Sequence, residues 1–162
     1  MGLRRSHESI DLVARGNCRL KTYDAPSPAT RWRMQCTPRR DTRGELALRS
    51  ALHRRGLRYR VDRRLWPSVR HKVDIVFRSA RVLVYFDGCF WHRCPQHFVP
   101  PQHNAGWWQT KIARNVTRDR AFQGRAEADG WLVRRVWEHE DLADAANKVE
   151  AAIRARTETN RY

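Results

Sequence analysis

The sequence predicts a single α/β domain with elements in the order α, β, β, β, α, β, α. Apolar residues recur at helical spacing in three segments, and short runs of β-branched and aromatic residues alternate with those segments. At 162 residues, the chain is long enough to bury one core and too short for two comfortable ones. The sequence contains no internal repeat or low-complexity tract, which argues against a repeat architecture.

The first predicted helix follows an N-terminal arm. Residues 1–28 mix Gly, Pro, Ser and charged residues without a sustained apolar period, so we expect a poorly ordered arm. Thr42 and Glu45 stand three residues apart in a capping-box pattern, which is typical of a helix start. Apolar residues at helical spacing follow them, and Gly56 is expected to end the helix.

Three strands are predicted next. The alternating segment Leu57–Val61 indicates a short strand. The segments Val73–Phe77 and Arg81–Phe86 are β-branched and aromatic runs, separated by a tight polar turn at Arg78 and Ser79. These two segments therefore predict a hairpin at the centre of the domain.

The C-terminal half predicts a long helix, a strand and a final helix. The long helix covers Trp107–Asp129 and ends at Gly130, and Trp131–Trp137 has the composition of a buried strand. A final amphipathic helix is marked by Leu142, Ala145, Ala146, Val149 and Ile153. We place the folded domain at residues 29–156 and a short C-terminal tail at residues 157–162.

The charge of the chain indicates a polyanionic partner. Lys and Arg outnumber Asp and Glu 33 to 17, which gives a formal net charge of +16. Nucleic acid is the leading candidate, although a solvated arginine-rich surface would give the same composition. The sequence has no apolar run of about 18 residues, so a membrane-spanning helix is not expected.

The N-terminus and the cysteines indicate a reducing compartment. The first residues include basic side chains but no apolar core of a secretory signal, so we expect a cytoplasmic protein. The four cysteines are Cys18, Cys36, Cys89 and Cys94. In a cytoplasmic chain, metal ligands or core residues are better interpretations of them than disulfides.

Two carboxylates occupy unusual places in the predicted hairpin. Asp74 interrupts an apolar strand, and Asp87 directly follows the next strand. A buried carboxylate is costly unless a cation compensates its charge, and Mg²⁺ prefers oxygen ligands. These two residues, with Glu45 from the first helix as a third oxygen donor, predict a Mg²⁺ site. The alternative is that Asp74 faces solvent at a sheet edge and that Asp87 caps the loop at Gly88.

A dense motif follows the hairpin. The segment from Phe86 to His97, FDGCFWHRCPQH, resembles the signature of the very-short-patch repair (Vsr) endonucleases. The resemblance extends from about Met34 through Glu140. Further blocks in register are Asp41 to Leu46, Val73 to Val76, Trp107 to Ile112, Asn115 to Arg120, Gly130-Trp131 and Val136 to Glu138.

The resemblance implies a fold and a catalytic site. The family has a restriction-endonuclease-like core of the PD-(D/E)xK type, which is a mixed sheet flanked by helices. Asp74 matches its catalytic aspartate and main Mg²⁺ ligand, Glu45 the glutamate that supports the metal waters, and His92 a catalytic histidine that transfers a proton. The sequence departs from the best-known pattern at Phe86 and Asp87, where a Thr-His pair usually stands, and Asp87 offers a carboxylate to the site instead. The alternative for His92 is packing beside its aromatic neighbour.

The resemblance also implies DNA-binding residues. Phe90, Trp91 and Trp108 match aromatic residues that insert into the DNA stack beside a mismatch, where unstacking costs least. Lys111 and Asn115, on the predicted long helix, are expected to contact DNA. The alternative for the aromatic residues is ordinary core packing.

A structural zinc site is implied as well. Cys94 and His97 form a Cys-x-x-His pair with suitable spacing for tetrahedral Zn²⁺. The family supplies the other ligands from positions that Asp119 and His139 hold here, with histidine in place of the usual cysteine at 139. Cys89 is expected to pack rather than bind. Without zinc, Cys94 would be a plain core residue.

The implied function is Mg²⁺-dependent nicking of one strand of double-stranded DNA at a T:G mismatch that deamination of 5-methylcytosine produces. We expect a monomer that associates with the nucleoid when bound to DNA and acts alongside a cytosine-5 methyltransferase system. Two alternatives remain: a nuclease of different specificity, such as one from a restriction system, and a relative that binds DNA without efficient cleavage.

Overall fold

The computed structural model describes residues 25–36, 38 and 40–159. The predicted arm therefore lies mostly outside the described residues. The elements are α1 (Pro28–Cys36), α2 (Arg43–Arg54), β1 (Arg60–Arg64), β2 (Lys72–Phe77), β3 (Val82–Asp87), α3 (Ala105–Ala128), β4 (Leu132–Trp137) and α4 (Leu142–Thr159). From α2 onward, their order is the predicted one.

The four strands form one mixed sheet in the order β1-β2-β3-β4. The pairs β1–β2 and β2–β3 are antiparallel, and β2 and β3 form the predicted hairpin. β4 runs parallel to β3 because α3 carries the chain back across the sheet before β4 begins. The register places Asp87 beside Trp137, so the ends of β3 and β4 lie together.

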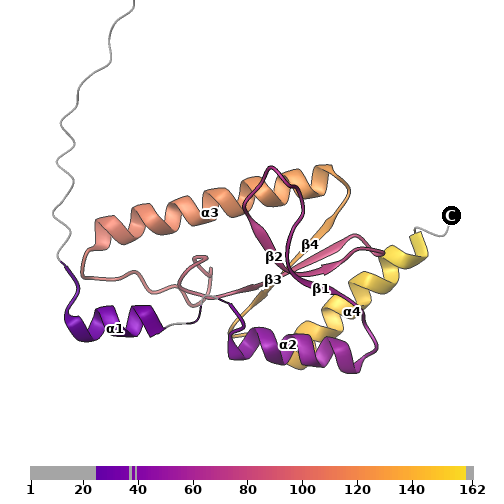
Figure 1. Ribbon diagram of the computed structural model, residues 1–162, viewed down its shortest axis with the longest axis horizontal. Coiled ribbons are helices and arrows are strands. Elements are labelled where there is room, and N and C mark those ends of the chain that lie inside the picture. The colour runs from indigo at the N-terminus through magenta and orange to yellow at the C-terminus, as the bar shows by residue number, and fades with distance from the viewer. Residues whose placement is uncertain (1–24, 37, 39, 160–162) are drawn as a thin grey trace, which may run out of the picture.

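Helices cover both faces of the sheet (Figure 1). On one face, Leu48 and Leu52 of α2 and Val149 of α4 form a buried cluster with side chains from β2, β3 and β4. On the other face, Phe122 and Ala126 of α3 pack against a second buried cluster from the same strands. The domain thus has three layers, with the sheet in the middle.

The structure corrects one predicted strand boundary and adds one helix that was not predicted. The first strand begins at Arg60, not Leu57, because Leu57 and Tyr59 pack against the core before the chain pairs with β2. The helix α1 has no counterpart in the predicted order, and its residues show no amphipathic pattern that would have revealed it. None of its residues is buried, and in Figure 1 it lies away from the sheet.

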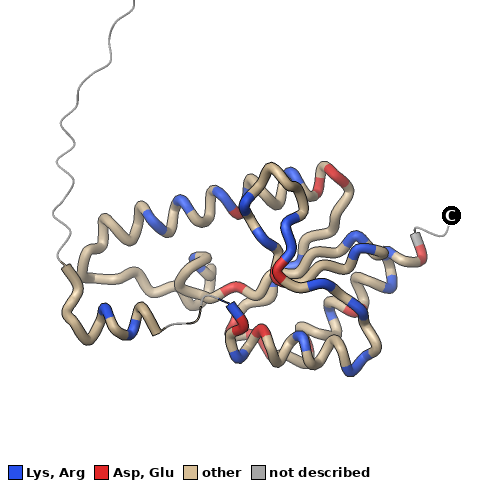
Figure 2. The backbone as a smooth tube through the Cα atoms, in the orientation of Figure 1, with Lys and Arg blue, Asp and Glu red and all other residues tan. Residues whose placement is uncertain are grey.

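Basic residues are distributed over most of the elements in Figure 2, and acidic residues gather where the start of α2 meets the sheet.

Within the described part of the chain, no helix is both long and apolar enough to cross a membrane.

The start of α2 is pressed against the end of β3. A Cβ added at Gly44 would lie 2.2 Å from the Phe86 ring, whereas one added at Gly124, in the middle of α3, meets nothing within 4 Å. Glycine at position 44 therefore allows a contact that sets the distance between α2 and the sheet.

We predict that Gly44→Ala and Gly124→Ala change stability in opposite directions. Gly124→Ala should raise the free energy of unfolding by about 0.5–1 kcal/mol, because alanine has the higher helix propensity. Gly44→Ala should lower it by about 1–3 kcal/mol, because Phe86 must move. Urea unfolding of both variants measures this difference. Equal stabilisation by both would contradict the packing described here.

Candidate functional site

One end of the sheet gathers the predicted catalytic residues. Asp74 lies near the start of β2, Asp87 is the last residue of β3, and Glu45 lies in the first turn of α2. Because β2 and β3 are antiparallel, the start of β2 and the end of β3 meet at the same end of the sheet. The contact of Gly44 with Phe86 brings the first turn of α2 to that end as well.

Asp74 is a partly buried carboxylate that forms no ion pair with a basic side chain of the described residues. Its Oδ2 accepts a hydrogen bond of 2.9 Å from the backbone N–H of Phe86, and no Lys or Arg of the described residues forms an ion pair with it. Burial raises the pKa of Asp74 to about 6, and the negative charges of Glu45 and Asp87 add to this rise. The site therefore favours any cation that can reach this carboxylate.

Glu45 is held in place from one side. Its Oε2 accepts hydrogen bonds from the backbone N–H of Asp41, at 2.8 Å, and from Nη2 of Arg49, at 3.2 Å. Arg49 also pairs with the side chain of Asp41. Thr42 caps α2 as predicted, by accepting the N–H of Glu45. The carboxylate of Glu45 is thus oriented by a small network at the helix start.

Asp87 is 1% exposed and forms a bidentate ion pair. Nε of Arg135 donates to its Oδ2, and Nη2 of Arg135 donates to its Oδ1 at 2.9 Å. Burial raises the pKa of Asp87, and the Arg135 guanidinium opposes this rise. The predicted Mg²⁺ ligand therefore already has a cationic partner from β4.

His92 and Asp119 form a second close pair. Nδ1 of His92 lies 2.6 Å from Oδ2 of Asp119 and 3.6 Å from Oδ1 of Asp87. Burial favours a higher pKa for Asp119, but the hydrogen bond from His92 and the nearby charges of Arg135 and Arg118 outweigh it, so the pKa is lowered. Because an ionised carboxylate only accepts, the His92 Nδ1 proton belongs to this bond. Nε2 then remains as the second nitrogen for proton transfer.

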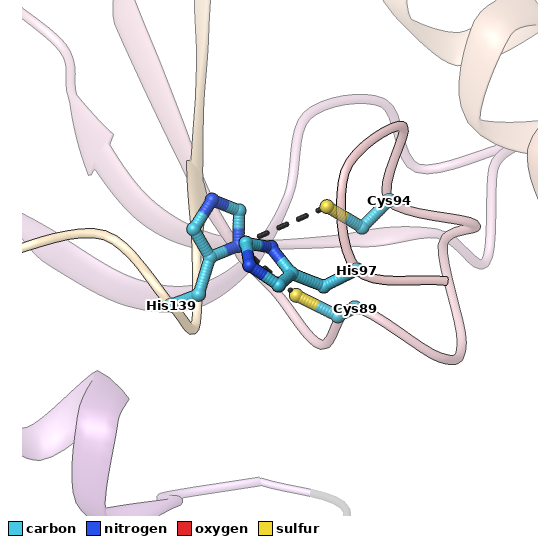
Figure 3. A group of neighbouring side chains, drawn as sticks. All are labelled: Cys89, Cys94, His97 and His139. Atoms are coloured by element: carbon cyan, nitrogen blue, oxygen red, sulfur yellow. Dashed lines mark hydrogen bonds between the residues drawn. The ribbon is translucent and has the colours of Figure 1, made fainter. Parts of the chain in front are cut away.

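A separate Cys/His group lies next to this pair. Cys89, Cys94, His97 and His139 place one ligand atom each within 4.8 Å of one another, and Figure 3 shows their side chains pointing together. Sγ of Cys89 lies 3.1 Å and Sγ of Cys94 3.7 Å from Nδ1 of His139. Tetrahedral Zn²⁺ holds its ligand atoms about 3.5 Å apart, so this donor set fits that ion.

This group differs from the predicted zinc ligands at one position. Asp119 was expected to bind zinc and Cys89 to pack, but the structure places Asp119 with His92 and Cys89 in the group. The physical reason is the tight loop after β3, where the N–H of Cys94 donates to the carbonyl of Cys89 at 2.9 Å. This bond brings both thiols to the same side. Without a cation, burial raises the pKa of Cys89 to about 11.

Aromatic residues gather around a lysine at the start of α3. Nζ of Lys111 lies 5.3 Å, 4.6 Å and 5.2 Å from the ring centres of Trp91, Trp107 and Trp108. Phe90 contacts two of these rings, with centroids 5.2 Å from Trp91 and 5.1 Å from Trp108. The structure thus brings the three predicted wedge residues and Lys111 together.

Part of this aromatic cluster is open to solvent. Trp91 is 39% and Trp107 40% exposed, which is unusual for residues with so much apolar surface. The side-chain amide of Asn115 donates to the carbonyl of Trp91 at 3.3 Å. Asn115 thereby supports the loop that carries the tryptophan.

Sequence reasoning missed two arginines of the site. Arg135 and Arg49 each pair with an acid that the sequence analysis had identified. The available signals were an arginine inside the apolar strand from Leu132 to Trp137, and an arginine four residues after Glu45 on the same helix face.

Comparison with known proteins identifies the family. Residues 23–96 match the family model described as DNA mismatch endonuclease Vsr. The chain is 50% identical over 131 residues to the type II nicking enzyme V.NaeI of Lentzea aerocolonigenes, which covers 79% of each protein. The chain belongs to the Vsr family.

A second Vsr relative is more distant. The DNA mismatch endonuclease Vsr of Escherichia coli (strain K12) is 35% identical over 130 residues, 76% of this chain and 81% of the relative. Both relatives are named as enzymes that cut DNA. This Vsr family member is accordingly a DNA endonuclease, and the resemblance inferred from the sequence is confirmed.

We predict that Asp74→Asn stabilises the protein when no divalent cation is bound at Asp74. The pKa of Asp74 is raised in the folded state, so stability is lost as the pH rises from about 4, where the unfolded carboxyl ionises, to about 6, where the folded one does, and the uncharged amide avoids this loss. The gain at pH 7.5 should be about 1–3 kcal/mol and should shrink towards pH 3, where the folded and unfolded carboxyls are both largely protonated. Urea unfolding across this pH range measures it. A gain that grew towards pH 4 would contradict the environment described for Asp74.

Proposed function

We propose that this endonuclease nicks one strand of double-stranded DNA at T:G mismatches, with Mg²⁺ held at Asp74 and Zn²⁺ held by the Cys/His group. The observation that carries the catalytic part is the partly buried carboxylate of Asp74, which forms no ion pair with the described basic residues and stands beside Glu45. Mg²⁺ bound there would activate water and stabilise the charge on the scissile phosphate. We assign the sheet end to the PD-(D/E)xK type of active site on this basis.

The side chains around Asp74 have distinct roles in the proposal. Glu45, held by Arg49, directs its carboxylate towards the metal waters. His92 donates its Nδ1–H to Asp119, and in the protonated imidazole Nε2–H would donate its proton to the leaving oxygen.

DNA recognition is assigned to the exposed aromatic cluster. Trp91 and Trp107 offer flat apolar surface, and Lys111 adds a positive charge above the rings. A mispaired step is the cheapest place to unstack a duplex, so insertion of these rings would favour a mismatch over paired DNA. The net charge of +16 supports the sequence-independent part of the affinity.

A nuclease of different specificity is the second candidate. The relative from Lentzea aerocolonigenes is named as a type II nicking enzyme, and it is 50% identical to this chain. For the first candidate, deamination of a 5-methylcytosine made by a partner methyltransferase system would supply the T:G substrate.

We predict Mg²⁺-dependent nicking of a T:G duplex and no nicking of the matched C:G duplex. The substrate should be a labelled library with randomised flanking sequence, because the recognised sequence is part of the question. Sequencing of the nicked products gives both the mismatch preference and the sequence context. Cleavage of matched duplexes instead would favour the second candidate.

Asp74→Ala is the control for the nicking assay. It should abolish nicking and leave DNA affinity within about threefold of the original, because phosphate contacts from basic residues dominate affinity. Equal nicking by this variant would overturn the assignment of Asp74.

We predict that Cys89→Ser and His139→Ala release the bound zinc and lower the free energy of unfolding by at least about 2 kcal/mol. Cys36→Ser is the matched control, because Cys36 is exposed on α1 and lies outside the group. Asp119→Asn should keep the zinc. Metal analysis and thermal unfolding measure both effects, and zinc retained by Cys89→Ser would show that Cys89 is not a ligand.

A further inference from the structure

Arg135 is an arginine in the middle of a largely buried strand. It stands beside Tyr85 in the parallel pairing of β3 and β4, and its guanidinium carbon lies 5.3 Å from the centre of the Tyr85 ring. The preceding residue, Arg134, is exposed. Successive residues of a strand point to opposite faces, so the side chains of the two arginines lie in different surroundings.

The guanidinium of Arg135 uses two donors on one carboxylate. Both oxygens of Asp87 are engaged, and the Asp87 side chain is only 2% exposed. A fork-shaped guanidinium matches a carboxylate in this way, whereas a lysine presents a single point charge. A cation that bound Asp87 would have to displace this pair.

The same guanidinium reaches the catalytic histidine pair. Its Nη2 lies 3.4 Å from Oδ2 of Asp119 and 3.3 Å from Nδ1 of His92. Two buried carboxylates, Asp87 and Asp119, thus share one guanidinium beside one imidazole. Removal of Arg135 would leave Asp87 without its arginine, whereas Asp119 would keep Arg118 and His92, so the freed carboxylate of Asp87 would then attract a cation.

Asp74 has the opposite surroundings. Its neighbours Glu45 and Asp87 are acids whose charges raise its pKa more than Arg49 lowers it, and no basic side chain of the described residues forms an ion pair with it. One end of the sheet therefore holds two kinds of carboxylate: one already neutralised by an arginine and one that is not.

We propose that Arg135 is a positioning residue of the nuclease site, which withdraws Asp87 from the cation and keeps the Asp119–His92 pair in place. The catalytic cation is thereby confined to the Asp74 side. This inference rests on the proposed function in placing the cation at Asp74, and it adds that the acid at position 87 is structural and that its partner is Arg135.

Manganese binding to the zinc-loaded full chain tests the proposal without DNA. Electron paramagnetic resonance counts the bound Mn²⁺ and gives its affinity. We expect Asp74→Asn to lower the affinity at least tenfold and Asp87→Asn to change it less than about threefold, because only Asp74 is a ligand. Arg135→Gln should add a second, weaker Mn²⁺ site at the freed carboxylate of Asp87. Arg134→Gln is the matched control and should leave binding unchanged.

A double variant controls for loss of folding. A buried ion pair with one partner removed is strongly destabilised, whereas removal of both charges is tolerated better. Asp87→Asn combined with Arg135→Gln should bind Mn²⁺ like the original chain. If either variant at Asp87 loses Mn²⁺ as completely as Asp74→Asn, Asp87 is a ligand and the proposal is overturned. If Asp74→Asn alone leaves binding intact, the cation site of the proposed function fails instead, and this inference fails with it.

Single-turnover nicking tests the positioning role. Arg135→Gln should slow nicking at saturating enzyme by roughly 10–100-fold and leave the Kd for DNA within about threefold, as expected for a residue that acts through its neighbours. Arg135→Lys should restore part of the rate, because it keeps the charge but not the bidentate geometry. A weaker Kd with an unchanged rate would make Arg135 a DNA-binding residue and contradict the proposal.

Discussion

The uncompensated charge of Asp74 is the constraint on which the site depends. The carboxylate of Asp74 is partly buried, has two acids near it and forms no ion pair with the described basic residues, so burial raises its pKa to about 6 and a bound cation would stabilise its ionised form. The other acids are treated differently by the fold: Arg49 pairs with Glu45, and Arg135 pairs with Asp87. Of these three acids, Asp74 is therefore the one without an ion pair among the described residues.

The loop after β3 joins the two proposed metal sites. His92 lies between Cys89 and Cys94 in sequence, so the Cys/His group fixes the loop on both sides of the histidine. The backbone N–H of Cys89 also donates to Oε1 of Glu138 at 2.7 Å, which ties the loop to the segment after β4. A metal in the Cys/His group would therefore act on catalysis indirectly, by holding His92 against Asp119.

The same loop carries the aromatic surface. Trp91 precedes His92, and its carbonyl is held by Asn115 of α3. The ring proposed to enter DNA is thus one residue away from the histidine assigned to proton transfer. This spacing gives a physical route by which insertion beside a mismatch could place the scissile phosphate at the catalytic end of the sheet.

The local features of the fold were predictable from the sequence. Thr42 and Gly130 mark helix ends through local backbone chemistry, and the apolar runs of β2 and β3 predict the hairpin. The strand β1 starts at Arg60 rather than at the predicted Leu57. Leu57 and Tyr59 alternate as in a strand, but they pack against the core before pairing with β2 begins.

The partners of the site residues were less predictable. Asp87 and Arg135 are 48 positions apart and meet only because α3 returns the chain to pair β4 with β3. Asp119 is one residue on a long helix, and nothing in its sequence neighbourhood distinguishes a zinc ligand from a partner of His92. Spacing could indicate the types of residue in the site, but the tertiary fold decides which of them meet.

Anomalous diffraction from crystals of the zinc-loaded chain soaked in Mn²⁺ tests the central claim most directly. The account predicts a manganese peak at coordination distance, about 2.1 Å, from the carboxylate of Asp74, with the Arg135–Asp87 pair intact. A peak on Asp87 with Arg135 displaced, or no peak beside Asp74, would contradict it.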